Sequence, residues 1–434
     1  MSQKLHRIVI VGGGAGGLEL ATKLGRELGC KKHAHIILVD GSPTHIWKPL
    51  LHEVATGALN TGEDEVNYFG HAYRNGYQFE FGWMKGLDRE RKTIQLASVC
   101  DANGDILTGE RDIAYDTLVL ALGAIANDFG TPGAQKHCMF LNTPNDAEKL
   151  RRRILDLSFA VGTSGHGASK LTIGIVGGGA TGVELAAEID HTIREMHNYG
   201  ANLNPAQLEI TIIEGAPRIL SGAPESLSHY ATEELVQRGI MVACNARVAA
   251  VSETGFQLAD GQQINAAIRV WAAGVKAPDW LANLGLSTNR NNQIEVTTCL
   301  QTQTDPNIFA IGDCAAAPDG EGRPQLSATA QVAHQQASWL AEALIKRLNG
   351  KAITPFVFKP QGMMVSLGKH TAVGSLAAVV GPKRNYYVEG RGAKLIYASL
   401  YRLHQAAVHG WVLAVLLWIG DKLRRVGRPT LKLH

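Results

Sequence analysis

Two glycine-rich turns are the part of this chain whose residue types and spacing best suit binding of a diphosphate. Residues 12–17 read Gly-Gly-Gly-Ala-Gly-Gly, residues 177–182 read Gly-Gly-Gly-Ala-Thr-Gly, and both fit G-x-G-x-x-G. The first glycine of such a turn makes the tight bend, the second lets a pyrophosphate approach the backbone, and the third allows close helix packing. The chain is therefore expected to bind two dinucleotides. The expected contacts are Gly12, Gly13, Gly14, Ala15, Gly16 and Gly17 in the first turn, and Gly177, Gly179 and Gly182 in the second.

An acidic residue follows each turn at the position where ribose is recognised. Asp40 closes the apolar run after the first turn, and Glu214 closes the corresponding run after the second. A carboxylate there accepts a hydrogen bond from a ribose 2′-hydroxyl and repels a 2′-phosphate, so Glu214 predicts NAD(H) and not NADP(H). One chain with two dinucleotides is most economically a flavin plus a nicotinamide, because hydride passes naturally between them.

The segments around both turns read as βαβ units, which are the elements that must position these residues. A β-branched run at residues 7–11 precedes the first turn, apolar residues at helical spacing follow over 18–28, and a second buried run ends at Asp40. The same order recurs over residues 171–176, 183–193 and 209–214. The repeat therefore predicts two domains built on one plan. A further buried strand is expected over residues 307–313, a helix over 328–348, and a small antiparallel layer within 355–400.

Composition limits the class of protein. The 434 residues, of which 45% are hydrophobic and 19% charged, suffice for two or three domains and are too apolar for a disordered chain. The six cysteines include no C-x-x-C pair, which argues against a disulfide framework, a zinc site and an iron–sulfur cluster. The apolar run at residues 8–11 is too short for a signal peptide. We expect a folded protein without a metal site that stays in the compartment where it is made.

The C-terminal end differs from the rest of the chain in charge and hydropathy. Residues 391–434 carry eight Lys or Arg and one Asp, a balance of +7, whereas the residues before them carry −4. Residues 403–420 contain no charged side chain, and a basic cluster begins at Lys422. This stretch is short for a ~30 Å hydrocarbon core, and an apolar face with tryptophans and a basic cluster suits a helix lying on an anionic leaflet. We expect residues 403–428 to bind a lipid surface; packing into a dimer interface or core, or a spanning helix, remains the alternative.

Several longer stretches make the chain resemble a known family. The stretches are residues 8–17, 47–57, 177–184, 271–274, 309–314 and 330–336. On these residues the chain is similar to the flavoproteins with two dinucleotide-binding domains and, among them, to the bacterial type II NADH dehydrogenases, which are single-subunit respiratory NADH:quinone oxidoreductases. The resemblance covers nearly the whole chain. Residues 47–57 and 330–336 are more specific to the family than the glycine turns.

The resemblance implies cofactor contacts for individual residues. Gly12, Gly14, Gly17 and Asp40 match the FAD-binding turn, and Gly177, Gly179, Gly182 and Glu214 match the NADH-binding turn. Gly123 matches the second flavin contact, Asp313 the acid near the ribityl and phosphate end, and Gly274 the nicotinamide-side loop. Lys48, within residues 47–57, is also expected to contact a cofactor. For Asp313, a strand-end cap is the alternative.

The resemblance also implies three residues close to the chemistry. Glu184 matches a carboxylate held near the nicotinamide and flavin, and Gln331 and Gln335 match glutamines that line the quinone pocket. The two glutamines are four residues apart, which puts both on one helical face. A first-turn carboxylate that complements the helix dipole is the alternative for Glu184, and solvated positions are the alternative for the glutamines. His334 is expected to be a surface or capped histidine and not a metal ligand, and Gln361 departs from a lysine that several relatives carry.

The fold class implied is α/β, with two Rossmann-like domains of the flavoprotein disulfide-reductase type and a C-terminal membrane-associating segment. Residues 1–128 and 296–350 are expected to bind FAD, residues 129–295 to bind NADH, and residues 351–434 to form a small β layer and an amphipathic anchoring helix. The boundaries rest on the resemblance and on the spacing of the two turns.

The implied activity is transfer of hydride from NADH to FAD and then of two electrons to a membrane quinone, without proton pumping. The expected location is the cytoplasmic face of the bacterial inner membrane, as a peripheral protein of the respiratory chain. No nucleic-acid partner is expected, and a homodimer is left open. A sulfide:quinone oxidoreductase is one alternative, although that chemistry needs paired reactive cysteines. An NADH-sensing flavoprotein without quinone turnover is the other.

Overall fold

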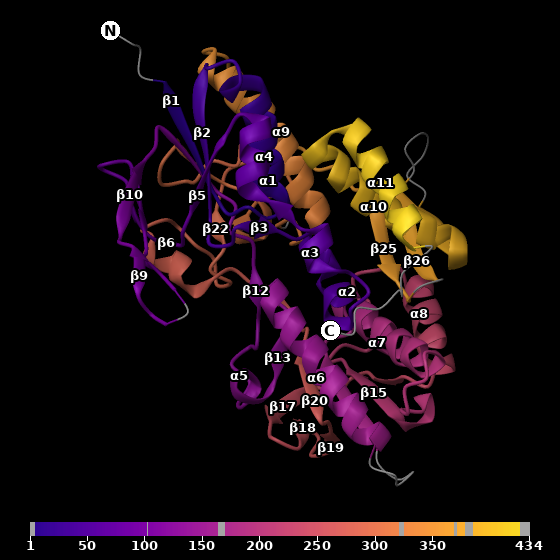
Figure 1. Ribbon diagram of the computed structural model, residues 1–434. Coiled ribbons are helices and arrows are strands. Elements are labelled where there is room, and N and C mark those ends of the chain that lie inside the picture. Colours follow the sequence, from indigo (N-terminus) through magenta and orange to yellow (C-terminus); the bar gives the residue numbers. More distant parts are fainter. Residues whose placement is uncertain are drawn as a thin grey trace. The chain divides into compact units, whose positions relative to one another are not determined.

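The chain divides into two compact units, each assembled from separate segments of the sequence (Figure 1). The computed structural model describes residues 5–101, 103–163, 170–320, 325–368, 371–377 and 385–425. Unit 1 comprises Met1–Trp47, Glu65–Ile125 and Val275–Lys359. Unit 2 comprises Lys48–Asp64, Ala126–Gly274 and Pro360–His434. Strands β12 (Ile125–Ala126) and β21 (Val275–Lys276) lie where the chain passes from one unit to the other.

Unit 1 is built on a five-stranded sheet with the strand order β23-β11-β1-β2-β5, in which all neighbours run parallel. Val9, Ile10 and Leu38 are fully buried, as a parallel sheet covered on both faces requires. The strands are β1 (His6–Val11), β2 (Ala34–Asp40), β5 (Gln78–Phe81), β11 (Thr117–Leu120) and β23 (Ile308–Ala310). The strand expected over residues 307–313 is therefore shorter, because Gly312 takes a φ of +71° and starts the 3₁₀ turn η5 (Gly312–Cys314).

Three helices of unit 1 lie close to the first glycine turn. α1 (Ala15–Leu24) follows β1 and continues as the π-helical turn η1 (Gly25–Gly29), so the helix expected over 18–28 is confirmed with a change of winding near its end. α9 (Ala330–Leu348) packs along α1, and its N-cap Thr329 accepts a hydrogen bond from the Val332 amide. α4 (Tyr68–Asn75) lies beside β5.

Short strands complete unit 1. An antiparallel sheet has the order β10-β7-β6, and three further strand pairs are β3 with β4, β8 with β9, and β22 with β24. Their bounds are β3 (Thr44–His45), β4 (Val66–Asn67), β6 (Met84–Asp88), β7 (Thr93–Leu96), β8 (Val99–Cys100), β9 (Ile106–Thr108), β10 (Arg111–Ala114), β22 (Ile294–Glu295) and β24 (Ala315–Ala316). The 3₁₀ turn η4 (Asp279–Asn283) follows β21.

Unit 2 repeats the plan with a parallel sheet of order β13-β20-β14-β15-β16. The strands are β13 (Met139–Phe140), β14 (Leu171–Val176), β15 (Leu208–Ile213), β16 (Met241–Ala243) and β20 (Ile268–Trp271). An antiparallel sheet is formed by β17 (Val248–Val251), β18 (Gly255–Leu258) and β19 (Gln263–Asn265). The second expected βαβ unit is thus confirmed.

The helices of unit 2 come from several parts of the sequence. They are α2 (Leu51–Thr56), α3 (Thr61–Asp64), α5 (Ala134–His137), α6 (Pro144–Thr163), α7 (Ala180–Asn198) and α8 (Glu225–Gln237), with 3₁₀ turns η2 (Lys48–Leu50) and η3 (Pro205–Gln207). α2 comes early in the chain yet packs against both α6 and α7 (Figure 1). α7 therefore receives side chains from a segment well over a hundred residues earlier in the sequence.

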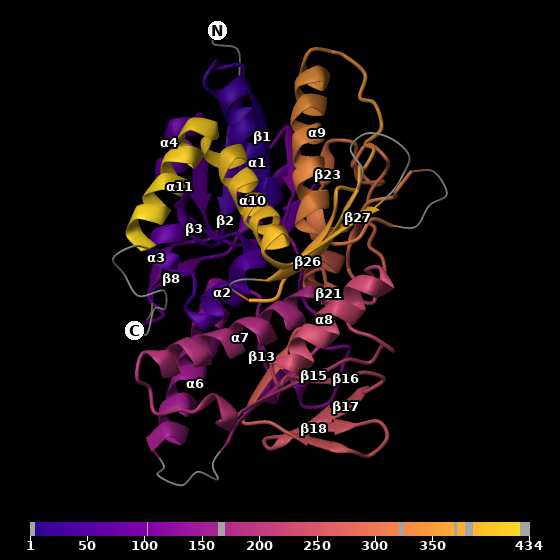
Figure 2. The same ribbon diagram turned by 90° about the vertical axis from the view of Figure 1, so that its right-hand side faces the viewer.

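The C-terminal region of unit 2 contains the expected antiparallel layer, β25 (Gly362–Ser366), β26 (Ala372–Ala377) and β27 (Asn385–Glu389). The helix expected over residues 403–420 is wrong as a single element: α10 (Gly390–His409) and α11 (Trp411–Arg425) are separated at Gly410, whose φ is +87° (Figure 2). Among the described residues, no helix is long and apolar enough to cross a bilayer. Arg428 lies outside the described residues.

Candidate active site

The first glycine turn has the geometry of a phosphate cradle. Gly12 has a φ of +102°, and a Cβ there would lie 2.3 Å from the Ala121 carbonyl oxygen. A Cβ on Gly17 would lie 1.8 Å from the Gly12 oxygen, so only glycine fits at both positions. Gly14, the N-cap of α1, has nothing within 4 Å of a Cβ position and makes no side-chain cap. The start of α1 thus offers amides to an anion.

Asp40 is fixed against this turn. Its Oδ2 accepts a hydrogen bond from the Gly13 amide at 2.6 Å, and its Oδ1 accepts one from the Ser42 amide at 2.7 Å. Burial raises the pKa of Asp40, and both amides oppose that rise. An ionised carboxylate has about four acceptor sites, so capacity remains for a ribose hydroxyl. Tyr68 donates from its hydroxyl to the Gly13 oxygen at 2.6 Å and closes the other side of the turn, a contact that no sequence pattern predicted.

The segment Gly312–Cys314 and the start of α9 lie next to the first turn. A Cβ on Gly16 would lie 3.3 Å from the Ala333 oxygen, and one on Gly312 would lie 3.5 Å from the Ala333 Cβ. Asp313 is therefore in the same region of unit 1 as Gly12 and Gly14. Gly123, at a φ of +66°, also belongs to unit 1 and has open space at its Cβ position.

Gln336 is a polar residue here that sequence reasoning passed over, although it ends the stretch 330–336. Its side chain is fully buried, and its Oε1 accepts a hydrogen bond from the Gly312 amide at 2.6 Å. Its Nε2 has no hydrogen-bond partner among the described residues. A buried amide donor is costly without an acceptor. This donor, with the open start of α1, fits a site for a large polar group such as FAD.

The second turn repeats the first in unit 2. Gly177 has a φ of +111°, and a Cβ on Gly182 would lie 2.0 Å from the Gly177 oxygen. Glu214 accepts from the Gly178 amide through Oε2 at 2.6 Å and from the Ala216 amide through Oε1 at 2.7 Å. Gly179 caps α7 with no side-chain hydrogen bond and has nothing within 4 Å of a Cβ position. These residues fit a second dinucleotide in the same way.

Gly274 and Lys48 are the other expected cofactor residues of unit 2. Gly274 has a φ of +62°, a Cβ there would lie 2.5 Å from the Phe129 ring, and its carbonyl accepts from the Asn127 amide at 3.2 Å. Lys48 is exposed in η2. The structure thus explains why residue 274 must be glycine.

Glu184 lies in a buried cluster of titratable groups in unit 2. Its Oε1 accepts a hydrogen bond from the Ser366 amide at 3.0 Å, its Oε2 is 3.7 Å from the His52 Nδ1, and Tyr397 hydrogen-bonds to it. Burial, with help from Glu53, raises the pKa of Glu184 to about 8 against the opposing effect of those hydrogen bonds. No acidic residue lies in the first turn of α7, so a first-turn role for Glu184 is excluded.

Three partners in this cluster were not foreseen. His52 comes from α2, where burial lowers its pKa to about 3 and keeps the ring neutral. Lys394 comes from α10 and donates to the Ser366 hydroxyl at 2.6 Å. Tyr397 is also on α10, and burial raises its pKa well above the usual value. Of the three, only His52 lies in a stretch that the sequence analysis had singled out, residues 47–57.

Gln331 and Gln335 lie on one side of α9, as their spacing predicts. Both polar atoms of the Gln335 side chain bond to the backbone of one residue: its Nε2 donates to the Lys359 oxygen at 2.8 Å, and its Oε1 accepts from the Lys359 amide at 3.0 Å. His334 is half exposed, and its Nδ1 is 2.5 Å from the Oε2 of Glu19, which is buried. This agrees with the surface or capped histidine expected, and α1 and α9 share a polar contact there.

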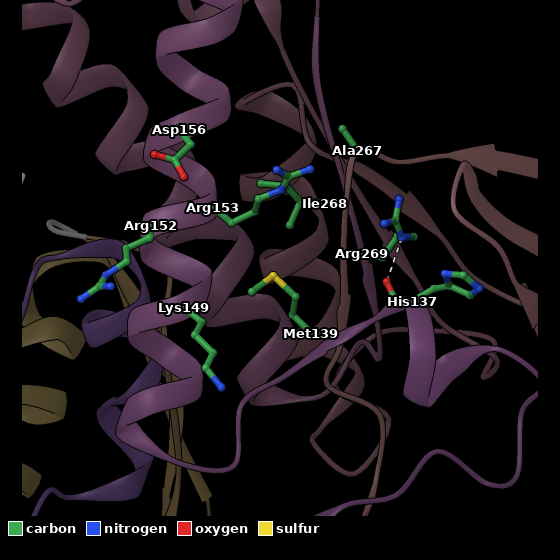
Figure 3. Close-up of a pocket in the computed structure, with 9 residues that line it drawn as sticks. All are labelled: His137, Met139, Lys149, Arg152, Arg153, Asp156, Ala267, Ile268 and Arg269. Atoms are coloured by element: carbon green, nitrogen blue, oxygen red, sulfur yellow. Dashed lines mark hydrogen bonds between the residues drawn. The ribbon is translucent and has the colours of Figure 1, made fainter. Parts of the chain in front are cut away.

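A basic hollow in unit 2 lies between α6 and the strands β13 and β20 (Figure 3). Arg269 in its wall donates to the carbonyls of His137, Glu253 and Ala266, and Arg152, which points away from Met139 in Figure 3, is 3.3 Å from Glu148. Two of its four cationic side chains, Lys149, Arg152, Arg153 and Arg269, are thus bonded within the protein. None of the expected site residues lines it. In the described residues, no group of three His, Cys, Asp or Glu side chains could hold a metal ion.

Comparisons with known proteins agree with the fold and the two turns. Residues 6–337 match the family described as pyridine nucleotide-disulphide oxidoreductase. The chain is 40% identical to the type II NADH:quinone oxidoreductase of Haemophilus influenzae, covering 99% of this chain and 100% of that one, and 31% identical to that of Staphylococcus aureus, covering 86% and 90%. An NDH2 of Plasmodium falciparum solved with NADH superposes with a TM-score of 0.81 at 20% identity, covering 99% and 100%. A sulfide:quinone oxidoreductase of Aquifex aeolicus superposes at 0.73 with 19% identity, covering 93% and 92%.

The fold and the paired glycine turns define an α/β oxidoreductase of the pyridine nucleotide-disulphide class. At 40% identity over nearly its full length, the chain belongs to the type II NADH:quinone oxidoreductases. The resemblance noted in the sequence is confirmed, as is the expected α/β class with Rossmann-like domains; membrane association of the C-terminal segment stays a prediction. The likeness to the sulfide:quinone oxidoreductase extends to the fold alone.

Proposed function

We propose that this chain oxidises NADH and reduces a membrane quinone through bound FAD, without pumping protons. When bound, FAD supplies the chemistry that accepts a hydride and releases two electrons to the quinone. The observation that carries the proposal is a hydrogen bond that occurs in both glycine turns. The Gly13 amide donates to Asp40 and the Gly178 amide donates to Glu214, each at 2.6 Å, and each turn leads into a helix without a side-chain N-cap. Relatives with the same activity by name, at up to 40% identity, support it.

Unit 1 holds FAD in this proposal, through the amides of residues 12–17, the Asp40 carboxylate, and Gly123, Asp313 and Gln336. Unit 2 holds NADH through Gly177, Gly179, Gly182 and Glu214, with Gly274 on the nicotinamide side. The expected domain boundaries, residues 1–128 with 296–350 for FAD and residues 129–295 for NADH, stay a prediction; they differ from the two units at residues 48–64 and 275–295. Glu214 selects NADH because its carboxylate repels a 2′-phosphate.

Gln331 and Gln335 line the quinone pocket in this proposal. A quinone oxygen needs a hydrogen-bond donor, and a neutral amide provides one at lower desolvation cost than a charged group. The Gln335 amide is bonded to the Lys359 backbone and holds that segment in position. Gln331 donates to the quinone in this proposal. Glu184 lies near the nicotinamide and flavin, and Lys48 contacts a cofactor.

The protein binds peripherally to an anionic bilayer through α10 and α11. The apolar side chains of α11 that are at least 44% exposed are Trp411, Val412, Val415, Leu416, Trp418, Ile419 and Leu423. The Lys422 ammonium lies 4.9 Å from the centre of the Trp418 ring, as in a helix with an apolar body and a cationic rim. We place this surface on the cytoplasmic face of the bacterial inner membrane. A homodimer through the same helices is the competing arrangement.

A visible spectrum of the purified protein tests the proposal. The flavin absorbance should bleach on addition of NADH and return on addition of a short-chain quinone. A colourless protein that does not bind added FAD would refute it. Bleaching without recovery would favour an NADH-sensing flavoprotein, and bleaching by sulfide in place of NADH would favour a sulfide:quinone oxidoreductase.

A further inference from the structure

One face of α7 carries a row of titratable side chains that runs from the interior of unit 2 to its surface. Glu184, Glu188, His191 and Glu195 are separated by four, three and four residues, which is the spacing of one helical face. Glu184 and Glu188 are buried, at 8% and 6% exposed. The side chains of His191 and Glu195 are 20% and 13% exposed, and their Nε2 and Oε1 atoms are 3.4 Å apart.

Glu188 is the least explained member of this row. No hydrogen bond or ion pair among the described residues involves its carboxyl group, although the side chain is buried. Burial raises its pKa to about 7, and Glu53 adds to the rise while Lys394 and Arg238 oppose it. A buried carboxyl group without a fixed partner costs stability. A carboxyl group with a pKa near ambient pH can both accept and release a proton.

The surroundings of the row come from several elements. His52 and Glu53 on α2 face the buried end, and Lys394 on α10 acts on both Glu184 and Glu188. At the outer end Arg238, next to α8, acts on Glu188. A Cβ on Gly368 would lie 3.0 Å from the Arg238 Nη1 and 3.9 Å from the His191 Cβ, so the backbone after β25 borders the row there. The row is thus enclosed along its length and reaches the surface near its last members.

The proposed reaction requires a proton from solvent. Hydride from NADH carries two electrons and one proton, so that NADH, quinone and one H⁺ give NAD⁺ and quinol. No other oxidant or reductant is needed. A proton must therefore enter the protein once in each turnover.

We propose that this face of α7 takes up that solvent proton, entering at His191 and Glu195 and held on Glu188 before it passes toward Glu184. The inference rests on the proposed function. Glu188 is a positioning and proton-holding residue here, because nothing puts it in contact with the quinone.

Two variants and one control test this path. Glu188→Gln keeps the size of the side chain and removes the titration, and His191→Gln removes a proton carrier at a position whose side chain is 20% exposed. His197→Gln is the matched control, since His197 is an exposed histidine in the last turn of the same helix. Each variant is assayed as full-length protein with bound flavin, and the reduction of the flavin by NADH is measured separately from its reoxidation by a short-chain quinone.

We expect both test variants to reduce their flavin within twofold of the wild-type rate, because hydride transfer needs no solvent proton. Reoxidation should slow by about tenfold or more, with a larger solvent deuterium isotope effect and loss of the pH dependence near 7. Imidazole in the buffer should partly restore His191→Gln, which a purely structural defect would not allow. The His197→Gln variant should match the wild type.

Reoxidation at the wild-type rate with an unchanged pH profile in both variants would overturn the proposal, as would equal loss of both half-reactions without rescue by imidazole. If Glu188→Gln does not fold, the reoxidation rate of His191→Gln and its rescue by imidazole test the proposal without it. Failure of the proposed function can be told apart from failure of this proton path. In that case the flavin of the wild-type protein would not respond to NADH or to quinone.

Discussion

The Nδ1 atom of His52 lies 3.7 Å from the Oε2 atom of Glu184, and both side chains are buried. Burial lowers the pKa of His52 to about 3 and raises that of Glu184 to about 8. At neutral pH the contact therefore joins a neutral ring to a carboxyl group that is mostly protonated. Both are held away from water, so the charge on Glu184 responds to small changes in its surroundings.

Burial of Glu184 makes stability depend on pH. The pKa of Glu184 rises from the ordinary 4.5 to about 8 on folding, so between these values the folded chain holds more protons than the unfolded chain. The contribution of Glu184 to the free energy of unfolding is therefore present in full below pH 4.5 and is lost as pH rises toward 8. Glu184→Gln, which keeps an acceptor for the Ser366 amide, should gain stability over the wild type with rising pH, by up to about 5 kcal/mol at pH 9.

Denaturant unfolding at pH 5, 7 and 9 measures this difference. Glu209→Gln is the control, because Glu209 is an exposed glutamate paired with Lys170 on the same unit. A stability difference between Glu184→Gln and the wild type that does not change with pH would contradict the raised pKa.

The nucleotide preference should depend on Glu214. Glu214→Gln removes the charge that repels a 2′-phosphate but keeps an oxygen for the Gly178 amide. We expect the ratio of kcat/KM for NADH to that for NADPH to fall by about tenfold or more, since one repulsive contact with an ionised group is worth more than ~1.4 kcal/mol. Steady-state kinetics with both nucleotides measures the ratio, again with Glu209→Gln as control. An unchanged ratio would show that Glu214 does not face the ribose.

Removal of the Gln331 amide should separate the two half-reactions. Gln331→Leu should leave flavin reduction by NADH within twofold of wild type and slow reoxidation by quinone by about tenfold, because one hydrogen bond to the quinone oxygen is lost. Stopped-flow absorbance follows both steps. Gln237→Leu, at the exposed end of α8, is the control. Equal slowing of the two steps would argue against a quinone role.

The α11 surface should govern membrane binding. Leu416→Glu places a charge at a position that is 58% exposed, and should reduce sedimentation with anionic vesicles at least fivefold while NADH oxidation by a water-soluble acceptor persists. Val236→Glu on α8, at 56% exposed, is the matched control and should still bind. Binding retained by Leu416→Glu would contradict the assignment, and a change in the sedimentation coefficient without vesicles would indicate a dimer interface.

The sequence by itself determined both dinucleotide turns, the acids that follow them and the α/β class. These features are local: the glycines must stand at fixed offsets because Gly12 and Gly17, like Gly177 and Gly182, touch each other across a few residues. The apolar runs on either side are continuous because a parallel strand is buried on both faces.

Only the tertiary structure decided the environment of Glu184 and the form of the C-terminal end. The partners of Glu184 are His52 and Ser366, which lie far from it in the sequence, one before it and one after it. The pKa of Glu184 depends on how completely these segments exclude water from its carboxyl group. The same holds for Gln335, whose amide is bound by Lys359, 24 residues later. The break between α10 and α11 at Gly410 could likewise not be predicted from composition, because the apolar content is the same whether one helix or two are formed.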